Sequence, residues 1–187
     1  MKTELKRQII HILVGALYAL IAYFLPKEQF FILLLAIFGT GSFLSYIQMK
    51  TNYFFFLQNL ISTVERTREK HIPGRAALSF TLGILISSIV FYQFEKIILI
   101  GAIITLTFGD GFSAIIGNWI GKHKIFGNKT FEGTIGGIIA ATIVLTFFFP
   151  IEIALPAAIF AMLAEYIPIN DNYVIPIVSG LVLGFLI

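Results

Sequence analysis

Asp110 points most directly to chemistry, because this carboxylate lies within a long apolar stretch of the chain. A carboxylate on a membrane helix costs about 3 kcal/mol even on mild scales, so it is usually functional or paired. At helical spacing Thr107, Ser113 and Gly117 share its face, which is therefore small and polar. We predict that Asp110 binds a metal ion. The alternative is close helix packing through Gly117 and Gly121, with Asp110 paired to a lysine.

The segment 121–134, GKHKIFGNKTFEGT, has the composition of an anion-binding loop. Glycines let backbone N–H groups approach a phosphate, lysines supply charge, and a helix N-terminus adds partial positive charge. It is not a Walker A loop, because the order G-x-x-x-x-G-K-[ST] is absent. Loop lysines can equally be membrane-surface anchors. The candidate phosphate ligands are Lys122, Lys124, Lys129, Gly133 and Thr130, which is also the expected N-cap of the next helix.

A late polar segment holds Glu165, Asn170, Asp171 and Asn172 without a lysine or arginine nearby. Mg²⁺ prefers carboxylate oxygens and is usually bound together with waters and substrate phosphates. This segment therefore predicts ligands for Mg²⁺. A solvated turn before a helix cap explains the same residues equally well.

Two basic clusters complete the set of candidate residues. Arg7 and His11 lie four residues apart on one predicted helix face, where His11 could act as a base, contact phosphate or be structural. His71 and Arg75 flank a Pro-Gly pair, where they could bind phosphate or anchor the chain at a membrane surface.

The elements that position these residues are membrane helices. The 187 residues are 58% hydrophobic and 12% charged, whereas a soluble domain carries about 25% charged residues. The chain has no cysteine, which excludes disulfides and thiolate metal sites. The net charge of +3 is spread along the chain instead of lying in one tail, so we expect no nucleic-acid partner.

Seven apolar stretches approach the roughly 20 residues that a transmembrane helix needs. The first resembles a signal peptide but has no small-residue cleavage site, so we expect an anchor. The last is short and contains Pro176, so its crossing is the least certain. We expect one domain, an all-α polytopic bundle over residues 1–187. The expected spans are 9–25, 30–47, 76–94, 97–120, 134–149, 151–167 and 173–187.

The basic residues predict the orientation of the bundle, because cytoplasmic loops carry an excess of Lys and Arg. With seven spans and a cytosolic N-terminus, only Lys27 and Lys96 of the thirteen Lys and Arg fall outside. In the cytosolic segment 51–74, apolar residues recur at helical spacing opposite polar ones. This pattern predicts an amphipathic helix on the membrane surface, or an extension of the second span. Gly180 and Gly184 could pack within the bundle or form a homodimer.

Three blocks of the sequence resemble, in matching order, the polyprenol kinase family of dolichol, phytol and farnesol kinases and CTP-dependent diacylglycerol kinases. The central block runs from GDG at 109–111 to KTFEGT at 129–134. The segment RQIIH at 7–11 is similar to the family's Arg-Lys-x-x-His, and the segment 165–176 to its late Glu…Asp-Asn…Pro. Phosphatidate cytidylyltransferases carry a related central block, but their Pro-Gly-His-Gly-Gly-like ending is absent.

The resemblance implies transfer of the γ-phosphate of a nucleotide, commonly CTP, to the hydroxyl of a membrane lipid alcohol. Asp110 and Asp171 would hold Mg²⁺, with Glu132 and Glu165 as further candidate ligands. Lys129 lies inside the family motif and is the leading phosphate ligand, with Arg7 and Arg75 as weaker candidates. His11 or one acid would accept the hydroxyl proton.

Two alternatives remain at the level of sequence. The first is a cytidylyltransferase that makes a CDP-activated lipid, and the second is a transporter with Asp110 in an ion or solute pathway. Compactness and the absence of a targeting tail favour a prokaryotic plasma membrane. The sequence leaves open which lipid alcohol is used, CTP against ATP or UTP, and the oligomeric state.

Overall fold

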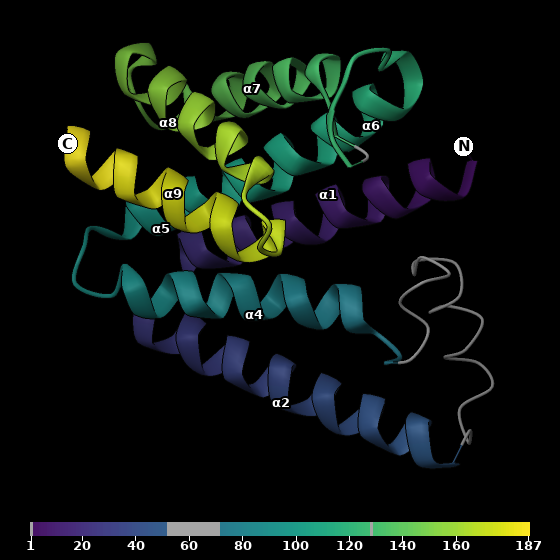
Figure 1. Ribbon diagram of the computed structural model, residues 1–187. Coiled ribbons are helices and arrows are strands. Elements are labelled where there is room, and N and C mark those ends of the chain that lie inside the picture. The colour runs from purple at the N-terminus through teal and green to yellow at the C-terminus, as the bar shows by residue number, and fades with distance from the viewer. Residues whose placement is uncertain (1, 52–71, 128) are drawn as a thin grey trace.

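The computed structural model describes residues 2–51, 72–127 and 129–187, and these residues form seven helices when the continuous helix 96–120 is counted once (Figure 1). The first two, α1 (Lys2–Phe24) and α2 (Lys27–Thr51), are separated by a turn at Pro26. The helix α4 (Arg75–Val90) begins after Gly74, whose φ of 79° is the left-handed conformation that favours glycine. The expected amphipathic helix and His71 lie outside the described residues.

The helix 96–120 contains a local change of winding. It consists of α5 (Lys96–Ile104), a π-helical segment η1 (Thr105–Asp110) and α6 (Gly111–Ile120). π-Helical turns within α-helices are rare and often lie at functional sites. This one ends at Asp110, so it sets the direction of the residue that the sequence singles out.

A small hairpin follows α6. Its strands, β1 (Lys124–Phe126) and β2 (Lys129–Thr130), pair antiparallel, and Gly127 has a φ of 57°. The remaining helices are α7 (Phe131–Leu145), α8 (Ile151–Leu163), the 3₁₀ turn η2 (Ala164–Tyr166) and α9 (Asp171–Leu186). The helix α9 continues through Pro176.

At one end of the bundle, lysine side chains connect the ends of helices to neighbouring turns. Lys27 Nζ donates to the carbonyl oxygens of Tyr92 at 2.9 Å and Phe94 at 2.7 Å. Lys96 Nζ donates to the carbonyl oxygen of Tyr23 at 2.7 Å. The two ammonium groups thus donate hydrogen bonds to carbonyl oxygens that have no helical partner at helix ends and turns.

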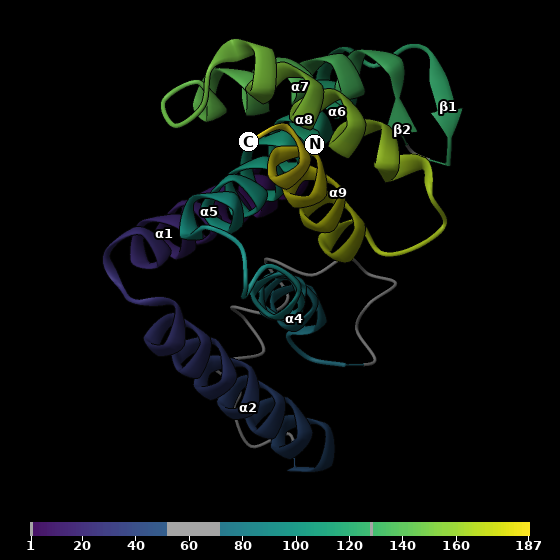
Figure 2. The ribbon, with the colours of Figure 1, turned by 90° about the vertical axis from the view of Figure 1, so that its left-hand side faces the viewer.

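At the opposite end the helices extend to different extents (Figure 1). The N-terminus of α1 and the C-terminus of α2 extend beyond the start of α4. At 1.5 Å per residue, the helices α4, α7 and α9 are about 22–24 Å long and α1 about 34 Å. The hairpin lies at this same end (Figures 1 and 2).

The apolar core lies between α1, α4, α5, α7, α8 and α9, with Ile84, Leu106, Ala158 and Leu183 fully buried. The helix α2 is peripheral and packs mainly on α4 (Figure 2). Gly180 and Gly184 pack within the chain: a Cβ at Gly180 would overlap the ring of Phe91, and one at Gly184 would lie 2.9 Å from Phe94. The alternative of packing inside the bundle therefore accounts for this glycine pair.

The predicted all-α class is confirmed, and a helix forms at each predicted span. Three helices are long and apolar enough to cross a membrane, namely Glu4–Phe24, Lys27–Thr51 and Lys96–Ile120. Shorter apolar helices occupy Arg75–Val90, Phe131–Leu145 and Asp171–Leu186.

Candidate functional site

A cluster of charged side chains forms around Lys129, where β2 leads into α7. Its Nζ lies 2.7 Å from Asp171 Oδ2, 3.1 Å from Glu165 Oε2 and 3.6 Å from Asp110 Oδ1. These four residues come from β2, the start of α9, η2 and the end of η1. The central and late sequence blocks therefore meet at one ammonium group.

His11 brings the first block to the same place. Its Nε2 lies 3.7 Å from Asp110 Oδ2, and this nitrogen is buried without a hydrogen-bond partner among the described residues. The ring also hydrogen-bonds the backbone of Leu106 and packs on Phe80, with ring centroids 4.5 Å apart. A ring that donates to a carbonyl from one nitrogen keeps the other nitrogen as an acceptor. His11 thus directs its Nε2 atom toward the Asp110 carboxylate.

Glu165 is the most buried acid of the cluster, with 3% of its surface exposed. Its Oε1 accepts from Thr134 Oγ1 at 2.6 Å, and its Oε2 accepts from Ser113 Oγ at 3.3 Å and from Lys129. Tyr166 Oη lies 2.5 Å from the same Thr134 hydroxyl. Both oxygens of Glu165 are therefore occupied, and its carboxylate connects η2 to α6, α7 and β2.

The start of α9 places Asp171. Asn170 caps the helix by accepting the Asn172 N–H at 3.0 Å, and Asn172 Nδ2 donates to Ser79 Oγ on α4 at 2.9 Å. Pro176 has no N–H to offer the carbonyl of Asn172, four residues earlier. That carbonyl packs against Gly83 of α4, where an added Cβ would overlap it. The turn is therefore both a helix cap and part of the cluster.

The charges of the cluster do not balance, because three carboxylates face one ammonium when His11 is neutral. Burial opposes the charge on Lys129, but the carboxylates of Asp110, Asp171 and Glu165 outweigh burial and raise the pKa of its ammonium. Burial raises the pKa of the Asp171 carboxyl; Lys129 lowers it and Asp110 raises it further. The excess of negative charge makes this a place where a cation would be stabilised.

Glu132 lies in a different environment from the other three acids. Its carboxylate accepts from the backbone N–H groups of Lys122 at 3.1 Å and His123 at 3.2 Å, and contacts His123 Nδ1 at 2.6 Å. Its own backbone N–H and the His123 ring lower the pKa of Glu132 to about 2. Two loop N–H groups that could have met a phosphate, those of Lys122 and His123, are thus bound to Glu132, which ties the hairpin to α7.

The other predicted phosphate ligands are spread around the cluster. Lys122 and Lys124 are exposed on the loop and on β1, and Arg75 is exposed at the start of α4. Arg7 forms a bidentate ion pair with Glu4, one turn earlier on α1. Lys129 is the predicted basic ligand that contacts Asp110, Glu165 and Asp171.

Thr130 is the N-cap of α7, as predicted, and its Oγ1 accepts the Gly133 N–H at 3.1 Å. Gly133 allows close contact between α6 and α7, because a Cβ there would lie 2.7 Å from the Ser113 carbonyl oxygen. Gly117 and Gly121 both lie against Thr130, where added Cβ atoms would come within 2.8 Å and 2.6 Å of its Oγ1. Both parts of the packing alternative are therefore present, the close contacts at the glycines and a lysine beside Asp110, while the binding of a metal ion by Asp110 stays a prediction.

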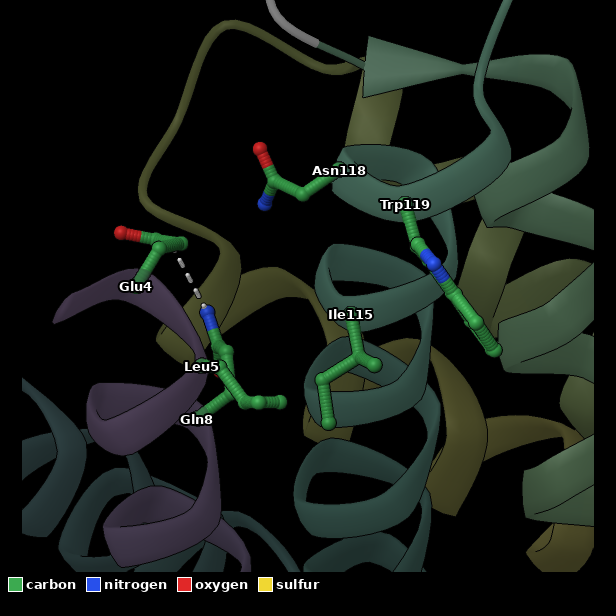
Figure 3. Close-up of a pocket in the computed structure, with 6 residues that line it drawn as sticks. All are labelled: Glu4, Leu5, Gln8, Ile115, Asn118 and Trp119. Carbon is green, nitrogen blue, oxygen red and sulfur yellow. Dashed lines mark hydrogen bonds between the residues drawn. The ribbon is translucent and has the colours of Figure 1, made fainter. Parts of the chain in front are cut away.

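A separate cavity of about 280 Å³ lies between α1 and α6 (Figure 3). Leu5, Ile115 and Trp119 give it an apolar wall, and Glu4, Gln8 and Asn118 supply its polar atoms. Sequence reasoning missed this cavity, as well as Tyr166 and the role of Thr134. Thr134 stands four residues after the N-cap Thr130, but nothing in the local pattern marks its contact with Glu165.

The chain is thus an apolar helical bundle in which a half-buried lysine lies among three acids near the helix ends. The chain is 30% identical over 185 residues to an uncharacterized protein of Methanocaldococcus jannaschii, covering 97% of this chain and 93% of that protein. It belongs to the same family as that protein. No family model matches the sequence. No solved structure matches the chain either.

Proposed function

We propose that this protein is a nucleotide-dependent kinase that phosphorylates the hydroxyl of a membrane lipid alcohol, with CTP as the expected donor. One observation carries the proposal: His11, Asp110, Lys129 and Asp171, from three distant blocks of the sequence, converge in one cluster. These blocks are also the ones that resemble the polyprenol kinase family. Phosphoryl transfer depends mainly on positioning and on compensation of charge, which such a cluster can supply.

Lys129, His11 and Glu165 would have separate roles in the reaction. Lys129 has 26% of its side chain exposed, and its ammonium would bind phosphate oxygens. His11 Nε2 would take the proton of the acceptor hydroxyl. The hydroxyl oxygen then bonds to the γ-phosphorus, the bond from that phosphorus to the β–γ bridging oxygen breaks, and a nucleoside diphosphate leaves. Glu165 would position Lys129, because its own oxygens are already occupied.

The cluster also fits Mg²⁺ in donor type and in charge. The described residues contain no group of three His, Cys, Asp or Glu arranged to hold a metal. However, Mg²⁺ is commonly held by one or two carboxylates together with substrate phosphates and waters. Asp110 and Asp171 would be its protein ligands, and the ion would neutralise the charge on the phosphates. The environment of Glu132 makes it a structural residue in this proposal, and Glu165 is a weaker candidate ligand than the two aspartates.

We further propose that all seven helices span the membrane, with the N-terminus and the cluster on the cytosolic side of a prokaryotic plasma membrane. Three helices are long enough by themselves. The distribution of Lys and Arg supports this orientation, because Lys27 and Lys96 lie at the end opposite the cluster. Nucleotide would then reach Lys129 from the cytosol.

The test is incubation of the purified protein in detergent with Mg²⁺, γ-labelled CTP and lipid alcohols, including diacylglycerol, phytol, geranylgeraniol and a polyprenol. We expect label in an organic-phase lipid phosphate, and matched reactions with labelled ATP and UTP identify the donor. If phosphatidate instead releases labelled pyrophosphate, and α-labelled CTP labels the lipid, the protein is a cytidylyltransferase. Absence of nucleotide binding together with solute uptake in proteoliposomes would make it a transporter.

A further inference from the structure

The hairpin between α6 and α7 carries large apolar side chains that the bundle does not bury. On β1, Ile125 is 52% exposed and Phe126 is 55% exposed. Neighbouring residues of a strand point to opposite faces, so the bundle covers neither face of β1. Trp119 and Ile120, at the end of α6, are also more than half exposed. Grouped exposed apolar residues of this kind mark a surface that another molecule covers.

The outer face of α7 continues this apolar surface away from the hairpin. Exposed apolar residues stand at every fourth position of the helix, namely Phe131, Ile135, Ile139 and Ile143. Residues four apart lie on one side of a helix. In a chain that spans a bilayer, an apolar face that no other helix covers lies against acyl chains. The hairpin therefore stands where a lipid-facing stripe begins, and the same lipids can cover its apolar residues.

The exposed charges of the hairpin are positive. Lys122 and Lys124 are both exposed, and neither ammonium forms an ion pair within the part of the chain that the structure describes. The one acid of the segment 119–132, Glu132, is bound to the N–H groups of Lys122 and His123 and to the His123 ring. The hairpin thus presents positive charge beside its apolar residues. Anionic phospholipid headgroups are complementary to lysines in this position.

The hairpin is fixed to the start of α7 and lies outside the bundle. The Phe131 N–H donates to the His123 carbonyl oxygen at 2.9 Å, and β1 pairs with β2. Figure 2 shows β1 at the outer edge of the molecule, beyond α6 and α7. Ile125 and Phe126 are therefore held away from the core. In the proposed orientation this end of the bundle is cytosolic, which places the hairpin beside the headgroups of the cytosolic leaflet.

We propose that the hairpin is a membrane-surface anchor that binds anionic phospholipid. Ile125 and Phe126 insert among the lipids of the cytosolic leaflet, and Lys122 and Lys124 bind the headgroups. The exposed Trp119 beside them agrees with this depth, because tryptophan is enriched where the apolar part of a membrane meets water. The inference rests on the proposed membrane orientation, and it goes beyond the proposed kinase because it needs no nucleotide.

The depth of β1 can be measured with a single tryptophan, because Trp119 is the one tryptophan of the chain. In the double variant Trp119→Phe/Phe126→Trp the two aromatic residues change places. We would place the full chain in phosphatidylcholine nanodiscs with and without brominated acyl chains and record tryptophan emission. Brominated lipid should quench this emission strongly, and acrylamide in the water should quench it weakly. The reverse result would overturn the insertion of β1 and leave the hairpin free for a protein partner.

The preference for a headgroup is tested with the same tryptophan in nanodiscs of mixed phosphatidylcholine and phosphatidylglycerol. Bromine is placed on only one of the two lipids in each sample. Brominated phosphatidylglycerol should quench more than an equal amount of brominated phosphatidylcholine, and added salt should reduce the difference, because it screens exposed charges. Equal quenching by the two lipids at low salt would contradict the binding of anionic headgroups.

Two matched pairs of substitutions test the position of the site. Lys122→Gln/Lys124→Gln removes the charges of the hairpin, and Lys6→Gln/Lys50→Gln removes two exposed charges at the same end of the bundle. One lysine at an anionic membrane surface changes binding by about fivefold. The first pair should therefore abolish the preference for phosphatidylglycerol, whereas the second pair should leave it. Equal effects of the two pairs overturn the inference.

Addition of CTP or inorganic phosphate at matched ionic strength distinguishes a lipid headgroup from a free phosphate. Neither should change the preference for phosphatidylglycerol. Its loss with CTP would assign Lys122 and Lys124 to the nucleotide and reject the anchor. None of these measurements needs turnover, so a protein that binds phosphatidylglycerol at the hairpin without phosphorylating lipid would keep the anchor and reject the kinase. Lipid phosphorylation without this preference would do the opposite.

Discussion

At the scale of single residues, Lys129 is the counter-charge that Asp110, Glu165 and Asp171 share. A buried ion pair is weak evidence for stability, but removal of one partner leaves buried charge without compensation and costs about 3–5 kcal/mol. Lys129 therefore has a structural effect as well as the proposed contact with phosphate. Its exposed neighbour Lys124 has no comparable environment.

Substitution of Lys129 and of Lys124 compares a lysine of the charged cluster with an exposed one. We expect Lys129→Met to lower the melting temperature and to reduce lipid phosphorylation by about 100-fold or more. Lys124→Met should change stability by less than about 0.5 kcal/mol, as is usual for a surface substitution. Thermal melting in detergent and initial rates measure both effects. Similar losses in the two variants would show that the cluster has no special role.

Much of this residue set could be predicted from the sequence. A carboxylate in an apolar helix is conspicuous, so Asp110 was found without the fold, and the motif pointed to Lys129. The partners of Glu132 could not be predicted, because they depend on the register of a hairpin that brings the N–H groups of Lys122 and His123 to its carboxylate. The roles of Thr134 and Tyr166 could not be predicted either, because their contacts join elements that are distant in the sequence.

At the scale of elements, the hairpin is attached to α7 by the Glu132 carboxylate. The pKa of this group is lowered from 4.5 to about 2 by its backbone N–H and the His123 ring. A lowered pKa in the folded state means that the contact contributes fully above about pH 4.5. The contribution is then lost as the pH falls through about 2.

Hydrogen exchange tests this attachment. After correction for intrinsic exchange rates, the amides of Lys122 and His123 should remain protected at pH 3.5 to about the extent seen at pH 6. Glu132→Gln should reduce their protection at both pH values. Loss of protection in the unmodified protein between pH 5 and pH 3.5, at about the ordinary pKa of a glutamate, would contradict the assigned contact.

The junction of α4 and α9 positions Asp171. Pro176 leaves the Asn172 carbonyl without a helical donor, and Gly83 leaves room for that carbonyl. The short last helix with its internal proline was the least certain span in the sequence. The structure explains why the proline is tolerated, because α4 supplies a complementary glycine.

Substitution of this glycine should separate the two helices. Gly83→Ala places a Cβ against backbone that cannot easily move, so we expect about 1–3 kcal/mol of destabilisation and reduced activity through displacement of Asp171. Gly39→Ala is the control, because a Cβ at Gly39 meets nothing within 4 Å. Its melting temperature should be unchanged or slightly higher. A Gly83→Ala protein as stable as the control would refute this packing.

At the scale of the whole molecule, composition and hydropathy predicted a helix at each apolar stretch, but not the unequal lengths at the cluster end. Segment boundaries in a sequence mark where apolar residues end, whereas helix ends here follow caps, turns and the π-helical segment. The convergence of three blocks was implied by their family resemblance and depends physically on tertiary packing.

The proposed orientation can be tested because the chain has no cysteine. Single variants Lys124→Cys, on the hairpin, and Glu95→Cys, just before α5, mark opposite ends of the bundle. In intact bacterial cells, an impermeant maleimide should label Glu95→Cys, and should label Lys124→Cys only after permeabilisation. Labelling of Lys124→Cys in intact cells would reverse the topology.

The most direct test of the central claim is the initial rate of phosphate transfer from γ-labelled CTP to geranylgeraniol by Asp110→Asn and by the unmodified protein. This substitution keeps the size of the side chain and removes the charge that faces Lys129 and His11. We predict a loss of about 100-fold or more with little change in melting temperature. An Asp110→Asn protein that phosphorylates lipid at the unmodified rate would contradict the assignment of this cluster as the site of phosphoryl transfer.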